Sequence, residues 1–211
     1  MPYPVSVDVT PAYTNRNRLT SGFRLILAIP HVILVGGIGL AYGFSSGGSR
    51  QRESFGGEAG LLGAVAFVLA IVSWFTIVFG GVHIVGIRQF TAFYLRWRVR
   101  AVAYLMLFED PYPPFGDGPY PASLEIVDPV GPRDRLTVGL RLLLAIPHFI
   151  VLVFLGFAWW ITSIISWVLI VATGEYPEGL YNFGVGVFRW LLRVQTYMLL
   201  MVDDYPPFSF S

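Results

Sequence analysis

The chain has 211 residues, of which 55% are hydrophobic and only 13% are charged. Ordinary soluble domains carry about 25% charged residues, so this composition is typical of a membrane protein. Cysteine is absent, which excludes disulfides, thiolate metal sites and cysteine nucleophiles. The formal net charge of +1 says little about partners, and nucleic acid is not expected to be one of them.

The start of the chain and the segment near residue 120 both alternate apolar and polar residues. Tyr3 to Val9 reads YPVSVDV, and Tyr120 to Ile126 reads YPASLEI. Alternation of this kind predicts a short, half-buried β-strand in each segment. The first 18 residues have no charged and apolar secretory signal, so we expect the later apolar stretches to be retained as membrane anchors.

A repeat follows each predicted strand. Arg18 to His31 reads RLTSGFRLILAIPH and recurs 117 positions later, from Arg135 to His148, as RLTVGLRLLLAIPH. Eleven of the fourteen residues are identical, and self-similarity at a fixed spacing marks a repeat architecture. We therefore divide the chain into a first copy, residues 1–117, and a second copy, residues 118–211.

The second halves of the two copies align at a shorter shift of 93 positions, which ends with DPYPPF at Asp110 and DDYPPF at Asp203. The change of shift places 24 extra residues in the first copy, between its first two apolar runs. The Gly- and Ser-rich segment 43–58 lies there and is typical of a flexible loop.

Long uncharged runs predict membrane-spanning helices. Residues 25–49 and 59–87 lack charge, and each contains enough apolar residues for the roughly 20 that cross a bilayer. In the second copy, 142–174 is one uncharged run. The repeat suggests that it also forms two helices, with a turn near Gly156 to Trp160; a tilted or re-entrant hairpin is the alternative.

The fold class expected is therefore an all-α integral membrane protein with two tandem pseudo-symmetric repeats. Each repeat would contain a strand, a transmembrane hairpin and an amphipathic helix at the membrane interface. Only Arg50 and Arg52 of the fourteen Arg residues lie in the loop between the first two apolar runs. By the positive-inside rule, the other side, which holds both termini, should be cytoplasmic.

The third helix of each copy carries a stripe of arginines. Gln89, Arg96 and Arg100 recur at helical spacing, and Arg189 and Arg193 repeat the pattern in the second copy. Arginine is costly inside a bilayer, so we expect these helices to lie in the interface, with their aromatic residues near the headgroups. The aromatic residues in question are Trp97, Trp190, Tyr104 and Tyr197. Either the stripes contact anionic lipid or an acidic partner, or they anchor the helix and pair with Glu109, Asp110 and Asp203.

His31 and His148 are the strongest candidates for chemistry, because each follows a proline inside a predicted helix. Pro30 and Pro147 free a backbone carbonyl one turn earlier, which an imidazole could satisfy. The alternatives are a haem or metal held by both imidazoles, or a proton relay. His83 is matched by Tyr176, which argues against a role shared by both copies.

Arg24 and Arg141 lie near the start of the first helix of each copy. Either they reach the interface, or they pair with the acids beside the YPPF segments. No acidic residue falls inside an apolar run, which disfavours ion-coupled transport. Phosphate-binding loops, HExxH and GxSxG motifs are also absent, so no enzymatic activity is expected.

These motifs resemble the bacterial domain-of-unknown-function 4389 family. The similarity lies in RLTVGLRLLLAIPH, in GEYPEGLYNFGVGVFRWLLRVQTYMLLMVDDYPPF and in their first-copy equivalents. The first copy departs at 82–87, where VHIVGI replaces EYPEGL. The resemblance implies a bacterial inner-membrane location and no known activity.

The function expected from sequence is a non-catalytic accessory or scaffold subunit. Gly36, Gly37 and Gly39 would allow close helix contacts with other membrane subunits or a second copy. The expected partners are thus the bilayer, its anionic headgroups and membrane proteins, with no cofactor. A haem- or metal-binding electron carrier using His31 and His148, and a small transporter or channel, are the two alternatives.

Overall fold

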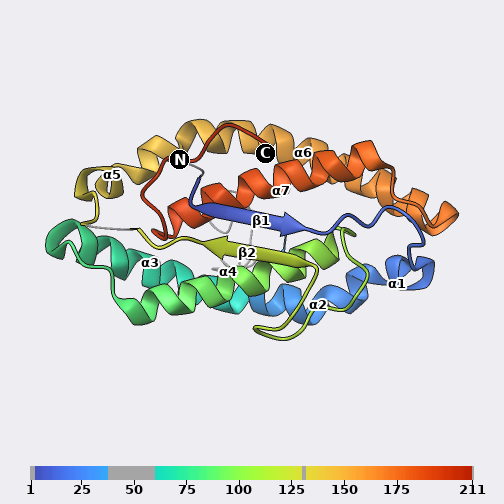
Figure 1. Ribbon diagram of the computed structural model, residues 1–211, viewed down its shortest axis with the longest axis horizontal. Helices are drawn as coiled ribbons and strands as arrows, with labels where there is room; N and C mark the ends of the chain where they lie inside the picture. The colour runs from blue at the N-terminus through green and yellow to red at the C-terminus, as the bar shows by residue number, and fades with distance from the viewer. Residues whose placement is uncertain (1–2, 38–59, 130–131, 211) are drawn as a thin grey trace, which may run out of the picture.

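The computed structural model describes residues 3–37, 60–129 and 132–210 (Figure 1). Most of these residues are helical. The elements, in chain order, are β1 (Val5–Val9), α1 (Arg18–Gly22), α2 (Arg24–Val35), α3 (Gly60–Gly80), α4 (Val85–Leu105), β2 (Ala122–Ile126), α5 (Arg135–Gly139), α6 (Arg141–Thr173) and α7 (Glu178–Met198).

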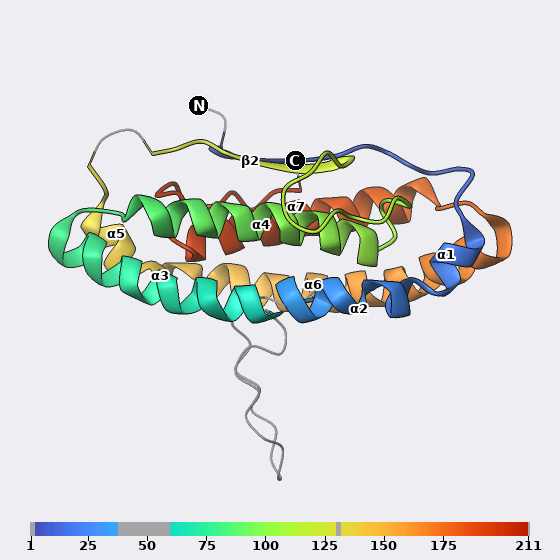
Figure 2. The same cartoon turned by 90° about the horizontal axis from the view of Figure 1, so that it is seen from below.

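The elements form three layers (Figure 2). The β1–β2 ribbon is one outer layer, α4 and α7 lie side by side beneath it, and α2, α3 and α6 form the opposite outer layer. Helix α7 contacts both α6 and β1, and α4 contacts α2, α3 and β2. The central helices are therefore covered on both sides.

Both predicted strands are confirmed, and they pair with each other. β1 and β2 run antiparallel, with Val5 opposite Ile126 and Val9 opposite Ala122. Val5, Val7 and Val9 are buried against α4 and α7, whereas the alternate residues Ser6 and Asp8 face outward. The alternation found in the sequence thus distinguishes the inner and outer faces of the ribbon.

The hairpin predicted for the second copy is wrong. Residues 141–173 form one continuous helix, α6, and the segment expected to turn, Gly156 to Trp160, is helical. Apart from Gly156 and Pro147 the run contains no residue that favours leaving the helix. Trp159, which lies within the expected turn, is buried against Phe108 and Phe188.

The first copy contains the same helix in two pieces. α2 and α3 have 12 and 21 residues, which together match the 33 residues of α6. They lie end to end, because the start of α3 at Gly60 abuts Leu34 and Gly36 at the end of α2 (Figure 2). A side-by-side hairpin is therefore wrong here too. The predicted loop at 43–58 lies outside the described residues.

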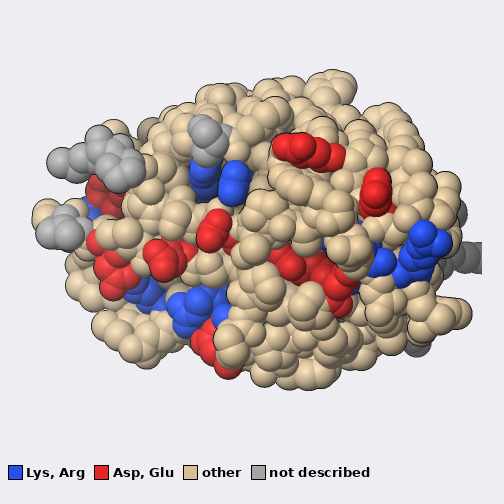
Figure 3. Space-filling model, turned by 45° about the vertical axis from the view of Figure 1, so that its right-hand side comes forward, with Lys and Arg blue, Asp and Glu red and all other residues tan. Residues whose placement is uncertain are grey.

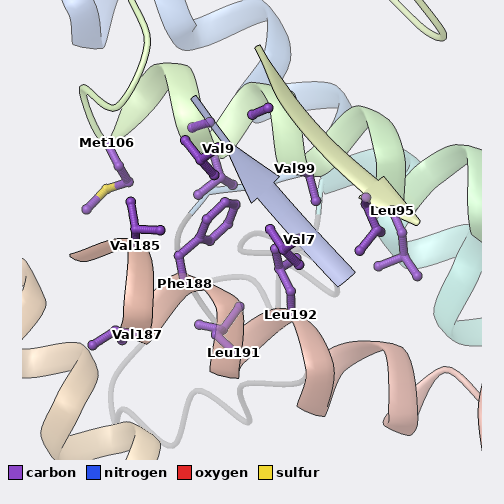
Figure 4. Packing of buried hydrophobic residues seen from close by; sticks show 14 of the residues in the cluster. Val7, Val9, Leu95, Val99, Met106, Val185, Val187, Phe188, Leu191 and Leu192 are labelled. Atoms are coloured by element: carbon purple, nitrogen blue, oxygen red, sulfur yellow. The ribbon is translucent and has the colours of Figure 1, made fainter. Parts of the chain in front are cut away.

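The core lies around α4 and α7, which corrects their predicted position at the membrane interface. Val99 on α4 and Phe188 and Leu192 on α7 are completely buried and pack beneath Val7 of the ribbon (Figure 4). The four aromatic residues expected near headgroups are also buried: Trp97, Tyr104, Trp190 and Tyr197. Tertiary packing, not a lipid surface, covers the apolar sides of these helices.

The two copies interlock at their ends. α1 of the first copy packs on α6 of the second, and α5 of the second packs on α3 of the first. Trp167 on α6 donates through Nε1 to the Ser21 carbonyl at 3.0 Å, and Trp74 on α3 donates to the Val138 carbonyl at 3.1 Å. Each long apolar helix is thus tied to the short helix of the other copy.

Candidate functional site

His31 and His148 lie in two separate clusters of the same design. The Nε1–H of Trp97 donates to Nδ1 of His31 at 3.1 Å, and that of Trp190 donates to Nδ1 of His148 at 3.0 Å. Phe115 stacks on His31, with ring centroids 4.5 Å apart. The YPPF segment of each copy therefore folds back over its own histidine.

The second cluster repeats this arrangement. Phe208 stacks on His148 at 4.0 Å, and Tyr205 packs beside it at 4.8 Å. The Tyr205 hydroxyl donates to the carbonyl of Leu144, one turn before Pro147. A helix loses backbone hydrogen bonding next to an internal proline, and this tyrosine supplies a replacement donor there.

The imidazoles do not fit a shared haem or metal. Tryptophan N–H can only donate, so Nδ1 of each histidine is an acceptor without a proton. Nε2 of each ring therefore carries the proton, and it is buried without a hydrogen-bond acceptor among the described residues. The clusters have no residue in common. Within the described ranges, no three His, Asp or Glu side chains are grouped as metal ligands.

A buried arginine–aspartate–arginine group lies at the end of α4. Asp110 accepts from Arg16 and Arg24, each at 2.8 Å, and Arg24 also lies 4.1 Å above the Tyr104 ring. Burial raises the pKa of Asp110, but the Asn17 amide and both guanidinium groups outweigh it and lower that pKa overall. Of the two alternatives considered for Arg24, the structure shows the pairing with the acid beside YPPF.

The second copy builds the equivalent group at the end of α7. Asp203 accepts from Arg133 at 2.7 Å and from Arg141 at 3.0 Å, and Arg141 lies 4.2 Å above the Tyr197 ring. Arg133 also donates to the Leu200 carbonyl at 2.8 Å. Cations are favoured at a helix C-terminus, where carbonyls lack partners, so each group closes its helix.

Sequence reasoning missed Arg16 and Arg133. They are separated by the same 117 positions as Arg24 and Arg141, so the internal alignment contained the signal. Their burial means that these four guanidinium groups contact protein and not lipid headgroups. This corrects the predicted lipid or partner contact at Arg24 and Arg141, which are 1% and 2% exposed.

The titratable residues beside the two arginine–aspartate groups differ between the copies. In the first copy, burial raises the pKa of Glu109 to about 7. In the second copy, burial and the neighbouring Arg133 lower the pKa of His83 to about 4. Glu109 corresponds to Val202 and His83 to Tyr176, so neither residue is present in both copies.

The two arginines of the α4 stripe share one aspartate. Asp117 accepts from Arg96 through both carboxylate oxygens, each at 3.2 Å, and from Arg100 at 2.9 Å. Arg100 also donates to the Gly116 carbonyl. Arg100 is buried and Arg96 is half-buried, so the predicted lipid contact of Arg100 is replaced by protein contacts.

The stripe of α7 has different surroundings. Arg189 donates to the Val7 carbonyl at 3.1 Å, and Arg193 donates to the Ser209 carbonyl at 3.3 Å. Within the described part of the chain, neither forms an ion pair with a carboxylate. A hollow of about 400 Å³ opens beside them, between β1 and the C-terminal segment.

Arg98, in the middle of α4, is a buried charge that only the first copy has. It donates to the Val35 carbonyl at 2.8 Å and to Gln195 at 3.1 Å, where α2 ends. The corresponding residue of α7 is Leu191, which packs near the uninterrupted helix α6. Arg98 therefore serves the helix end that the extra residues of the first copy create.

Charge and apolar surface are divided between opposite faces. Acidic and basic side chains gather on the side that carries the ribbon (Figure 3). The only charged residues of α2, α3 and α6 are Arg24 and Arg141, and both are buried. The outward side of these helices is thus an uncharged surface. Two of them, α3 and α6, are long and apolar enough to cross a membrane.

The motifs and the fold can be compared with known proteins. No curated protein and no solved structure matches the chain. The family model described as Domain of unknown function (DUF4389) matches twice, at residues 56–116 and 135–209. The two matches cover more than half of the chain and include both YPPF segments. The protein therefore belongs to the DUF4389 family, and it contains two tandem segments of it.

Proposed function

We propose that the protein is a non-catalytic membrane module that lies flat in one leaflet and presents its ribbon face to water. The observation that carries this proposal is the continuous apolar surface of α2, α3 and α6, which we call the apolar face. Its members are large hydrophobic residues at helical spacing: Leu25, Ile26, Ile29, Ile33, Leu61, Val65, Val68, Phe75, Phe79, Leu143, Ile146, Ile150, Phe154, Phe157, Ile161 and Ile164.

The extent of the apolar face favours lipid as its occupant. Soluble monomers rarely expose a contiguous apolar patch larger than a few hundred Å². At a rise of about 1.5 Å per residue, α6 alone extends this face over roughly 50 Å. Trp160 is 55% exposed on the same helix, and tryptophan is enriched at headgroup depth. A surface of this length and composition suits the plane of a bilayer.

The ribbon argues against an arrangement in which α3 and α6 cross the membrane. β1 and β2 form a two-stranded sheet, so each has one edge without a strand partner. The ribbon lies over the middle of the helices, and a crossing orientation would place its open edges, Asp8 and Glu125 at hydrocarbon depth (Figure 1). Unsatisfied backbone groups there cost several kcal/mol each. Lying flat keeps them in water.

This arrangement supports an accessory or scaffold role in the bacterial inner membrane. Both ends of the described chain lie on the ribbon side, opposite the apolar face (Figure 2). We propose that the arginine-rich ribbon side faces the cytoplasm, where anionic headgroups attract basic segments. In this proposal the ribbon face is the surface open to cytoplasmic or membrane-bound partners, and the buried arginine–aspartate groups hold it in place.

Flotation with lipid vesicles tests the membrane contact. Phe154→Asp places a carboxylate at the centre of the apolar face, where the native side chain is 72% exposed. Full burial of a phenylalanine contributes about 1.5–3 kcal/mol, so at least about a tenfold loss of vesicle partition is expected. Val127→Asp is the matched control, because Val127 is 63% exposed after β2, away from this face. Equal partition of both variants would refute the contact.

Cysteine labelling distinguishes lying flat from crossing. The chain has no native cysteine, so single-cysteine variants give one signal each. Pro132→Cys and Glu175→Cys mark exposed positions beyond the two ends of the α5–α6 segment. In sealed inner-membrane vesicles, an impermeant maleimide should label both from the same side. Labelling from opposite sides would show that α6 crosses the bilayer and that the transporter alternative must be reopened.

A further inference from the structure

We propose that Arg189 and Arg193 form a binding site for a carboxylate ligand. Both line the hollow of about 400 Å³ on the ribbon side, together with Tyr3, Ser6, Pro207 and Ser209. Arg193 is only 7% exposed, and its Nε–H is buried without a described acceptor. A buried cation with an unused donor is costly unless an anion pairs with it.

The first copy shows which group this pair of arginines binds. Arg96 and Arg100 correspond to Arg189 and Arg193 at the shift of 93 positions. There, Asp117 bridges both guanidinium groups, with a two-point contact to Arg96. Planar guanidinium and carboxylate groups match in geometry, and such charge-assisted pairs are stronger than neutral hydrogen bonds.

The second copy keeps the arginines and loses the acid. The residue that corresponds to Asp117 is Phe210, which packs against Phe183 and Trp190. The carbonyl contact is retained, because Arg193 donates to Ser209 where Arg100 donates to Gly116. The second copy therefore keeps both arginines and the carbonyl contact but lacks the carboxylate. A carboxylate from a ligand could occupy the position that Asp117 has in the first copy.

The location of the site indicates a ligand that arrives from water. The hollow is lined by β1 residues, which lie on the opposite side of the molecule from the apolar face. The ligand is either a free small carboxylate or an acidic side chain of a peptide segment. The inference does not depend on the placement of the apolar face in lipid, so either can fail without the other.

Calorimetric titration of the purified full-length chain in neutral detergent tests the site. The probes are succinate and the blocked peptide acetyl-Gly-Asp-Gly-amide, which copies residues 116–118; acetyl-Gly-Asn-Gly-amide is the uncharged control. We expect one saturable site for a carboxylate probe and none for the Asn peptide. Tighter binding of the Asp peptide assigns the site to a protein segment, and tighter binding of succinate assigns it to a free metabolite.

Variants of both copies locate the binding. The double variant Arg189→Gln/Arg193→Gln should weaken binding of the carboxylate probe at least tenfold. Arg96→Gln should leave the affinity within twofold, because Arg96 in the first copy is already paired with Asp117. Asp117→Asn should create a second site and raise the stoichiometry from one to two. Phe210→Asp should supply the acid internally and abolish binding.

Three results would overturn the proposal. The first is the absence of saturable binding of either carboxylate probe, and the second is equal binding after loss of both arginines. The third concerns the terminal carboxylate, because Ser209 borders the hollow. A chain with a neutral Gly-Ser extension after Ser211 should bind as the original does. Binding by the extended chain alone would assign the site to the terminus of the chain and not to a separate ligand.

Discussion

Replacing Asp203 with Asn would isolate the contribution of the buried arginine–aspartate groups. The carboxylate receives three hydrogen bonds, two from Arg133 at 2.7 Å each and one from Arg141 at 3.0 Å. The two arginines and the aspartate together carry a net charge of +1. The substitution raises this charge to +2 and leaves two guanidinium groups, 7% and 2% exposed, without their common anion.

The structure sets the size of the expected effect. Removing one partner of a buried ion pair costs about 3–5 kcal/mol, and the lower end applies because the Asp203 side chain is 21% exposed. For a chain of this length, about 3 kcal/mol corresponds to a fall of roughly 6–12 °C in the melting temperature.

Thermal unfolding in detergent, followed by circular dichroism, measures the change. Asp204→Asn is the matched control, because Asp204 is exposed and forms no ion pair with a described residue. It should melt within about 2 °C of the native chain. If Asp203→Asn melts as the control does, the arginines are not held by this carboxylate, and the account of how α7 ends is refuted.

Three further substitutions test other parts of the core in the same unfolding assay. Burial raises the pKa of Glu109 from 4.5 to about 7, so the cost of burying its charge grows as the pH rises from 4.5, is complete above about 7 and is lost at low pH. Glu109→Gln should therefore stabilise the chain by about 2–3 kcal/mol at pH 8 and by less than about 1 kcal/mol at pH 5; equal gains would contradict the buried charge. Trp190→Phe should cost about 1–3 kcal/mol, because Nδ1 of His148 loses its donor, and an unchanged melting temperature would argue against this hydrogen bond. Gly184→Ala should cost about 1–3 kcal/mol, because its Cβ would lie 2.9 Å from Trp159. Gly179→Ala is the control, because a Cβ there meets nothing within 4 Å, and it should be neutral or stabilising. A neutral Gly184→Ala would show that the core can shift.

Local patterns in the sequence predicted the two strands and the break between α2 and α3. Alternation marked β1 and β2, and the change of alignment shift placed the extra residues between Val35 and Gly60, where α2 ends and α3 begins. The internal repeat also related His31 to His148 and Arg24 to Arg141, which the structure places in matching contacts. These predictions succeeded because they depend on residues close in sequence or on internal comparison.

The predictions that failed assumed that lipid covers every apolar surface. The uncharged run of α6 was divided into two helices by comparison with the two apolar runs of the first copy, but those runs form α2 and α3, which lie end to end and correspond to one continuous helix. α4 and α7 were assigned to the interface because their cover, the β1–β2 ribbon, is formed by pairing between residues far apart in the sequence, from Val9 with Ala122 to Val5 with Ile126. Arg98 and Gln195 show the same limit, since their contact joins the two copies across 97 positions.

Pairing between the copies also sets an order for synthesis on the ribosome. β1 is complete at residue 9, but its partner β2 is complete only at residue 126, and Arg18 waits for the Thr173 carbonyl, 155 positions later. At about 5–20 residues per second, β1 stays without its partner for roughly 6–25 seconds. Because α4 ends at Leu105 and β2 at Ile126, the first copy has no ribbon over α4 until β2 has also been synthesised. The three-layer fold is complete only after the second copy has been synthesised. The two family segments therefore depend on each other to fold.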